Sequence, residues 1–419
     1  MKFYDFENKK IEFALQERKE ANEFFILTGD NGSGKSSLLL DIANKTRKQS
    51  KIKDKSFYSH NLYDATRVIA CTLTPFSKFD SSLSYFSDDD FIKIGGGTGS
   101  LSKYSLIFQA LVAFCDTDNL KKEIIEEVAK ITKFPGVFRV RLSVNKSRLQ
   151  MRPGLLENFN SITSNMLLNA GSFDLIMKPG TIDIVSRKAS QEEFIFNSKI
   201  RKNETPDFYI NNIIDNENKS EIINSILNFR RLGALRVNKI DFSSNENEWV
   251  PSENFSSGQL SFFVCMMILA STIKDGSTVL IDEPEVSLHP AWQRLYPKVL
   301  YKISNHFKFC KFFIATHSPI IVEESLRLGA NVVNMGSKID SLDKISLGDG
   351  QSIEGIYANY FNILTENSFF VKDLILNAVD SLSKNDKNGF LEYKKVLQEI
   401  KPKISDSSTK KIINEILKK

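Results

Sequence analysis

Between Gly29 and Ser36 the chain reads Gly-Asp-Asn-Gly-Ser-Gly-Lys-Ser, a spacing of glycine, lysine and serine that suits a polyphosphate. Gly29, Gly32 and Gly34 permit backbone conformations in which several N–H groups turn inward around one anion. Lys35 would then reach the outer phosphates, and the Ser36 hydroxyl would bind Mg²⁺. The simpler alternative is a glycine-rich turn that carries a solvated lysine.

Carboxylates and a histidine stand at the ends of two later apolar runs, 277–281 and 312–316. At the end of a buried strand, one acid can complete the Mg²⁺ shell while the next polarises the water that attacks a γ-phosphate. We assign the first role to Asp282 and the second to Glu283. His317 is placed to donate to the γ-phosphate, because ligands of α/β sheets bind at the carboxyl ends of the strands. An acidic turn and a structural histidine are the alternatives.

A run of small residues, Ser256-Ser257-Gly258-Gln259, precedes the apolar stretch 260–270. Small residues at a helix N-terminus expose backbone donors that suit a phosphate. Taken by itself, the run is better explained as a serine N-cap with a glycine turn. The order of the motifs favours the phosphate role, since the glycine-rich loop comes first, this run second and the Asp-Glu pair third.

The elements that must position these residues are predicted from apolar runs. Residues 24–28 predict the strand that delivers the glycine-rich loop, and residues 37–43 predict the helix onto which it opens. Residues 66–74 predict another buried strand. Further along, residues 120–131 predict an amphipathic helix, residues 137–142 a half-exposed strand and residues 173–185 two strands joined through Pro179-Gly180. The lysine-rich last fifty residues have helical patterning.

Composition describes an ordinary globular chain of 419 residues, 41% hydrophobic and 26% charged, with a formal net charge of +5. That charge is compatible with nucleic acid without requiring it. The basic run at 45–55 is interpreted as a solvated face or loop, with a nucleic-acid contact as the alternative. Cys71, Cys115, Cys265 and Cys310 lie far apart in apolar surroundings, which predicts buried thiols rather than disulfides or a zinc site.

Neither a membrane span nor a secretion signal is predicted. The longest apolar stretch, 262–270, is shorter than a bilayer-spanning helix, and the first residues lack the apolar core of a signal peptide. We therefore expect a cytoplasmic protein without a membrane partner.

The ordered motifs resemble the ATPase heads of the ABC superfamily, over residues 1–345 with unmatched sequence in the middle. Residues 29–36 match the Walker A motif, 255–259 the signature motif, 279–283 the Walker B motif, and His317 the switch histidine. Ser257 stands where transporters commonly have glycine, and Pro284-Glu285-Val286-Ser287-Leu288-His289-Pro290 follows Glu283. Ser257 is similar to the SSG form of SMC-like, RecF-like and OLD-like ATPases, and the segment after Glu283 is similar to the PExxLHP element of bacterial OLD-like ATPases. His289 is interpreted as interfacial or structural.

This resemblance implies an α/β P-loop NTPase fold of the ABC type, a mixed sheet flanked by helices. The expected domains are the first part of the head (1–115), an inserted α+β lobe (116–235), the second part of the head (236–345) and a helical C-terminal segment (346–419). Many such heads place a glutamine between the two lobes. Gln109 is instead assigned to the packing of an apolar helix over 106–114, so this glutamine is not identified.

The resemblance also implies ATP and Mg²⁺ as cofactors. The residues expected to contact the nucleotide are Gly29, Asn31, Gly32, Ser33, Gly34, Lys35, Ser36, Ser37, Ser256, Ser257, Gly258 and Gln259. Ser36 and Asp282 are expected to bind the metal, and Glu283, His317 and Lys35 to act in catalysis. Because the signature run of one subunit caps the ATP held by another, hydrolysis requires a homodimer or a higher even-numbered oligomer.

Many OLD-like ATPases act on DNA or in defence against phage, often beside a nuclease. The residues after Ile345 are too few for the Toprim nuclease of OLD proteins, so the chain is similar to stand-alone defence ATPases of the PtuA-like (Septu and retron) and AriA-like kinds. The leading hypothesis is a Mg²⁺-dependent ATPase that dimerises around ATP and regulates a separate nuclease or toxin. The alternatives are a DNA-binding RecF-like or SMC-like repair ATPase, the nucleotide-binding subunit of a transporter, and an ATP-dependent assembly clamp with slow hydrolysis.

Overall fold

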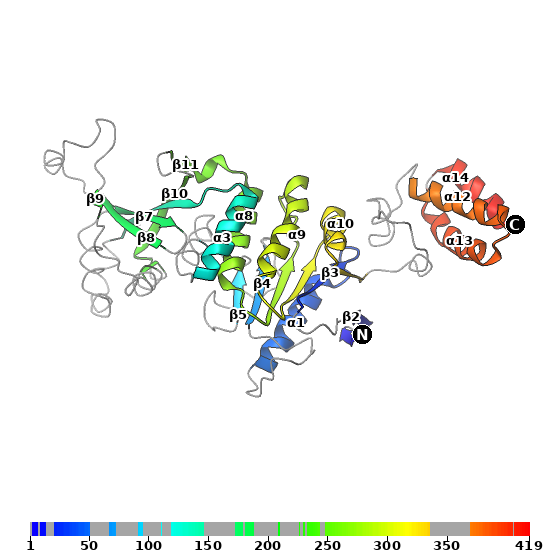
Figure 1. Ribbon diagram of the computed structural model, residues 1–419, viewed down its shortest axis with the longest axis horizontal. Coiled ribbons are helices and arrows are strands. Elements are labelled where there is room, and N and C mark those ends of the chain that lie inside the picture. Colours follow the sequence, from blue (N-terminus) through cyan, green and yellow to red (C-terminus); the bar gives the residue numbers. More distant parts are fainter. Residues whose placement is uncertain are drawn as a thin grey trace. The chain divides into compact units, whose positions relative to one another are not determined.

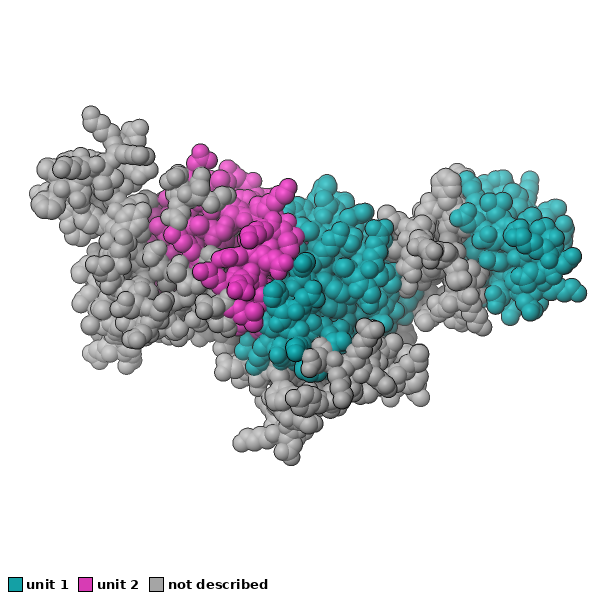
Figure 2. Space-filling view, in the orientation of Figure 1, with its two compact units in different colours: residues 1–96, 274–419 teal, residues 97–273 magenta. Residues whose placement is uncertain are grey.

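The computed structural model describes residues 2–6, 9–13, 21–50, 67–72, 91–94, 110, 119–145, 172–178, 181–187, 208–209, 226, 229–230, 233–243, 248–335, 369–404 and 406–419. The chain divides into two compact units, residues 1–96 with 274–419 and residues 97–273 (Figure 2). His60, Cys115, Gln109 and most of the basic run at 45–55 lie outside the described residues or have undescribed side chains.

The first unit contains a six-stranded sheet in the order β14-β3-β13-β12-β4-β5, in which all neighbours run parallel (Figure 1). Its strands are β3 (Glu23–Thr28), β4 (Arg67–Thr72), β5 (Phe91–Ile94), β12 (Ser277–Asp282), β13 (Lys311–Ala315) and β14 (Asn331–Asn334). Parallel strands end at one edge of a sheet. That edge therefore receives the ends of β3, β13 and β12 side by side, with β13 in the middle.

Helices bury both faces of this sheet. On one face, α1 (Lys35–Ser50) packs Leu38, Leu39 and Ile42 against residues of β3, β12 and β13. On the opposite face, the Phe24 ring stacks on Tyr301 of α9 (Pro290–Ser304), with 3.8 Å between ring centroids. Helix α10 (Pro319–Arg327) packs on α9 (Figure 1). Burial on both faces explains why these strands read as unbroken apolar runs.

Smaller elements complete the first unit. β1 (Lys2–Phe6) and β2 (Lys9–Phe13) form an antiparallel pair separate from the six-stranded sheet. At the C-terminal end, α12 (Phe369–Ser383), α13 (Lys387–Ile400), η4 (Lys401–Lys403) and α14 (Ser407–Leu417) enclose an apolar cluster of their own. The helical patterning predicted for the end of the chain is confirmed.

The second unit combines an antiparallel sheet with helices. The strand order is β11-β10-β6-β7-β8-β9. The strands are β6 (Val137–Val144), β7 (Ser172–Lys178), β8 (Thr181–Arg187), β9 (Phe208–Tyr209), β10 (Leu235–Ser243) and β11 (Val250–Pro251). The unit also contains α3 (Asn119–Thr132), η2 (Ser252–Asn254) and α8 (Ser257–Thr272). The predicted helix over 120–131 and the predicted strands over 137–142 and 173–185 are therefore confirmed.

Aromatic side chains hold α8 on the sheet of this second unit. Phe263 of α8 stacks on Phe134 with 3.9 Å between the ring centroids, and Phe134 meets Phe242 of β10 edge-on at 5.3 Å. Phe255, just before α8, stacks on Phe134 at 4.9 Å. Such pairs add to the stability that burial of the rings provides. The predicted boundary at 235/236 assigned α8 to the ATPase head, whereas the compact unit 97–273 contains it; the predicted domain ranges remain a prediction.

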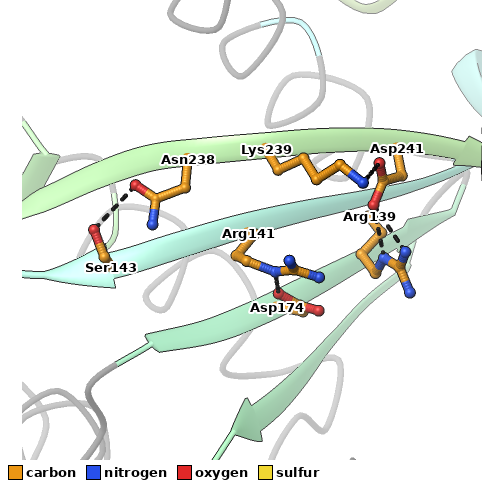
Figure 3. Close-up of polar contacts among 7 residues, drawn as sticks. All are labelled: Arg139, Arg141, Ser143, Asp174, Asn238, Lys239 and Asp241. Carbon is orange, nitrogen blue, oxygen red and sulfur yellow. Dashed lines mark hydrogen bonds and ion pairs between the residues drawn. The ribbon is translucent and has the colours of Figure 1, made fainter. Parts of the chain in front are cut away.

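The other face of the β6–β10 sheet carries paired charges (Figure 3). Arg139 donates to Asp241 at 2.8 Å, Lys239 reaches the same carboxylate at 3.0 Å, and Arg141 donates to Asp174 at 3.0 Å. Both carboxylates are buried. The basic groups of this face thus compensate buried acids, which reduces the positive charge that the face presents.

Candidate nucleotide site

Three glycines shape the loop between β3 and α1. Gly29, Gly32 and Gly34 have φ values of 135°, 78° and 96°, a region that residues with a Cβ rarely adopt. A Cβ built on Gly32 would meet no atom within 4 Å, so the loop is open on that side. Asn31 is exposed, and Ser37 lies in the first turn of α1. The predicted strand, loop and helix are therefore all present, in the predicted order.

Lys35 is folded back onto the glycine-rich loop. Its Nζ donates to the carbonyl oxygens of Gly29 at 2.9 Å and of Asp30 at 3.0 Å, and to Ser33 Oγ at 3.3 Å. Loss of hydration on burial lowers the pKa of Lys35, although nearby carboxylates, Glu283 first among them, oppose that shift. The ammonium therefore lies within electrostatic reach of the acids at the end of β12.

Ser36 and Asp282 meet at the edge of the sheet. The Ser36 Oγ donates to Asp282 Oδ1 at 3.0 Å, and the Asp282 carboxylate is buried. A hydroxyl and a carboxylate oxygen are ligands that Mg²⁺ accepts, and this ion usually takes few protein ligands besides phosphates and water. The pair fits the predicted metal site. Among the described residues, no cluster of three or more His, Cys, Asp or Glu side chains offers another metal site.

Glu283 occupies a strained backbone position directly after Asp282. Its φ is 49°, which for a residue with a Cβ costs roughly 1–2 kcal/mol. The Glu283 N–H donates to the carbonyl oxygen of Ala315 at 2.9 Å, which ties the ends of β12 and β13 together. Strain of this kind persists only where surrounding structure imposes it, and it is concentrated at functional sites.

His317 follows β13, the strand between β3 and β12. Burial lowers the pKa of its imidazole, and the positive charge of Lys35 lowers it further, while the charges of Glu283 and Asp30 act in the opposite direction. Lys35 and Glu283 are thus close enough to His317 to influence the pKa of its imidazole. The structure brings together the predicted catalytic residues of this unit.

Glu285 is a residue of this edge to which the sequence assigned no role. Its Oε1 accepts from the His317 backbone N–H at 2.5 Å, and its Oε2 accepts from Thr316 Oγ1 at 2.8 Å. Thr316 Oγ1 in turn accepts from the Ser318 N–H at 2.9 Å. Burial raises the pKa of the Glu285 carboxyl above its usual range, although these hydrogen bonds oppose the shift. In the sequence, the only sign of this role was that Glu285 follows Pro284 directly after the Asp282-Glu283 pair.

A second tie joins the His317 loop to the start of α9. Ser318 Oγ donates to Gln293 Oε1 at 2.6 Å, and Gln293 Nε2 donates to the Leu288 carbonyl at 2.9 Å. His289 is exposed at the N-cap of α9, where its Nδ1 accepts from the Ala291 N–H at 3.3 Å. The capping contact supports a structural role for His289.

The signature run lies in the second unit, at the N-terminus of α8. Ser256 and Gln259 form a reciprocal capping box, in which Gln259 N–H donates to Ser256 Oγ at 3.2 Å and Ser256 N–H to Gln259 Oε1 at 2.9 Å. Ser256 and Ser257 are exposed, whereas Gly258 is buried. The N-cap interpretation is confirmed, and the phosphate role of the run remains a prediction.

Three of the four cysteines are described. Cys71, Cys265 and Cys310 are buried free thiols, as predicted. Burial raises the pKa of Cys310 to about 12, which keeps this thiol protonated and unreactive. None of the helices in the described ranges has the length and apolarity that a membrane span requires.

A parallel sheet, a glycine-rich loop at its edge and an acid at the end of β12 define the class of the protein as a P-loop NTPase of the α/β type. Residues 154–323 match the family model described as "AAA domain, putative AbiEii toxin, Type IV TA system". The matched stretch includes α8, β12 and β13, and it starts after the glycine-rich loop. The match supports an AAA-type ATPase domain. A search of proteins with curated descriptions finds none that matches the chain.

Proposed function

We propose that the protein is a Mg²⁺-dependent ATPase that dimerises around ATP and regulates a separate effector, a nuclease or toxin, in antiphage defence. The observation that carries the ATPase part is the 3.0 Å contact between Ser36 and Asp282, which joins the glycine-rich loop to the acid at the end of β12. The AAA-type family match supports nucleotide hydrolysis as the activity.

In this proposal, each residue at the edge of the parallel sheet has its own role in ATP binding or hydrolysis. Backbone N–H groups of residues 29–36 bind the phosphates, and Lys35 exchanges its loop carbonyls for phosphate oxygens. Ser36 and Asp282 would hold Mg²⁺, which when bound neutralises charge on the phosphates. Glu283 orients and polarises the attacking water, and His317 donates a hydrogen bond to the γ-phosphate.

Dimerisation is the part that rests on the resemblance to ABC-type heads. Ser256 and Gly258 of one subunit would complete the site of the other by offering donors to the phosphates from the open side of the loop. The exposure of Ser256 at a helix N-terminus supports this role.

A system with a partner component is supported by the family description, which names a toxin–antitoxin system. Such systems consist of more than one component. The resemblance to PtuA-like and AriA-like ATPases leads to the same expectation.

Three variants test the proposal in ATP-binding and hydrolysis assays. Lys35→Ala removes the ammonium that faces the phosphates, so ATP binding and turnover should both be lost. Glu283→Gln should bind ATP, hydrolyse it slowly and accumulate as an ATP-bound dimer in light-scattering measurements. Lys45→Ala is the matched control, because Lys45 lies on the same helix in a partly exposed pair with Asp41 at 2.8 Å.

The outcomes separate binding from catalysis. Undiminished ATP binding by Lys35→Ala would refute the nucleotide site, and parental turnover by Glu283→Gln would refute the assignment of Glu283. If the parent protein forms an ATP-bound dimer but hydrolyses ATP too slowly for a working cycle, the protein is an ATP-dependent assembly clamp.

A DNA-maintenance ATPase is the alternative. The basic run at 45–55 and the lysine-rich last fifty residues favour it, but Arg139, Arg141 and Lys239 of the second unit are paired with buried carboxylates. Stimulation of the isolated protein by duplex DNA, with a steep dependence on salt, would favour this alternative. Stimulation only in the presence of a partner would favour the defence role.

A further inference from the structure

The segment between β12 and α9 is fastened to the end of β13 by the side chain of Glu285, a half-buried residue. Both carboxylate oxygens of Glu285 accept hydrogen bonds from consecutive residues of that end, the Thr316 hydroxyl at 2.8 Å and the His317 backbone N–H at 2.5 Å. Hydrogen bonds to charged acceptors are about twice as strong as neutral ones. A carboxylate this well enclosed is retained at an energetic cost, which points to a role other than stability.

We propose that Glu285 is a positioning residue for ATP hydrolysis, which holds the backbone of His317 and the strained Glu283 in register with each other. The proposal rests on the ATPase function proposed above. Glu285 contacts no nucleotide in this role; it acts through His317 and Glu283.

The geometry shows why Glu285 can transmit position. Glu285 lies two residues after Glu283, and turn hydrogen bonds from Val286 N–H to the Glu283 carbonyl (3.3 Å) and from Leu288 N–H to the Glu285 carbonyl (2.9 Å) stiffen the segment. A shift of Glu285 would therefore move the Glu283 backbone as well as His317. The Ser318–Gln293 contact provides a second, weaker constraint on the same loop.

The hydrogen-bond pattern also explains why a carboxylate is needed. Thr316 Oγ1 accepts from the Ser318 N–H at 2.9 Å, so its proton is directed away from Ser318 and toward Glu285. Two donors therefore face Glu285, and only a group with two acceptor oxygens satisfies both. Glutamine keeps one acceptor, while alanine keeps none.

The test compares Glu285→Ala and Glu285→Gln with the full-length parent. We expect kcat to fall about tenfold to a hundredfold in Glu285→Ala, with KM for ATP changed much less, because misplaced catalytic groups slow the chemical step. Glu285→Gln should retain an intermediate kcat. Glu324→Ala is the matched control, since Glu324 is a buried glutamate of the same unit that pairs with Lys298 at 3.2 Å; it should leave kcat unchanged.

A second readout does not depend on activity. The chain has four histidines, so ¹⁵N-histidine labelling gives few backbone amide signals, and loss of one signal in His317→Asn assigns that of His317. The hydrogen bond to Glu285 shifts this amide proton downfield. The shift should disappear in Glu285→Ala, persist partly in Glu285→Gln and remain in Glu324→Ala.

The outcomes distinguish this inference from the proposed function. The positioning role is overturned if the chemical shift of the His317 amide proton, or kcat, is unchanged in Glu285→Ala. It is also overturned if both Glu285 variants lose kcat equally. If the parent protein hydrolyses no ATP, the proposed function fails, while the amide signal still reports whether Glu285 holds His317. If Glu285→Ala does not fold, the test relies on Glu285→Gln. A parental kcat together with an unchanged chemical shift of the His317 amide proton in that variant contradicts the proposal.

Discussion

At the residue scale, a substitution in the glycine-rich loop can distinguish the effect of backbone strain on stability from the effect on ATP binding. Gly32 has φ 78° and open space where a Cβ would stand. Gly32→Ala should lower the free energy of unfolding by about 1–2 kcal/mol through the backbone conformation alone. Its methyl group would also project into the open side of the loop, so ATP affinity should fall at least about tenfold, which corresponds to 1.4 kcal/mol.

Gly329→Ala is the control for this prediction. Gly329 has φ 85° and equally open surroundings, but it follows α10. The two variants should lose similar stability in chemical denaturation, and only Gly32→Ala should lose ATP affinity in calorimetry. Equal ATP affinity in both would show that the open side of the loop does not face the nucleotide.

Glu285 should also make stability depend on pH. Burial raises the pKa of this carboxyl in the folded protein, so below its unfolded value both states are protonated and no stability is lost. As pH rises through the raised folded pKa, the folded protein loses stability, because the unfolded chain ionises more easily. Glu285→Gln should therefore gain stability over the parent as pH rises from 4 to 8, as measured by thermal unfolding. A stability difference between Glu285→Gln and the parent that shrinks as pH rises would contradict the raised pKa of Glu285.

At the element scale, the N-terminus of α8 combines a structural cap with a predicted phosphate contact. Ser256→Ala should cost about 1 kcal/mol of stability, whereas Ser256→Gly should cost only a few tenths, because glycine is tolerated at the N-cap. If the hydroxyl also contacts ATP across the dimer, both variants should lose ATP-dependent dimerisation to the same degree. If Ser256→Ala loses more dimerisation than Ser256→Gly, in proportion to its loss of stability, Ser256 acts only as the N-cap of α8.

Helices and strands of the first unit were predictable where burial is continuous along the sequence. The strand predicted at 24–28 is β3 (Glu23–Thr28), because its residues are buried on both faces. The helix predicted over 37–43 extends from Lys35 to Ser50. Its apolar pattern fades after Ala43, but residues 44–50 contain no glycine or proline that would end it.

At the scale of the whole molecule, ATP should stabilise the protein through linkage. A ligand that binds only the folded state at 100 times its Kd adds about 2.7 kcal/mol to the free energy of unfolding. Chemical denaturation with and without Mg²⁺-ATP should show this gain in the parent and in Lys45→Ala. Lys35→Ala should show none, and an equal gain in Lys35→Ala would indicate a nucleotide site elsewhere.

By itself the sequence determined the glycine-rich loop, the acids after β12 and the cap of α8. These features are contiguous, and short-range spacing is sufficient to specify glycine conformations, strand ends and an N-cap. The resemblance to ABC-type heads implied that Ser36 and Asp282 share a metal, but only the tertiary structure produces their contact. Ser36 bonds Asp282 across 246 residues because β3, β13 and β12 end at one edge. Glu285 reaches His317 for the same reason: strand order, which no local pattern encodes, places the ends of β12 and β13 side by side.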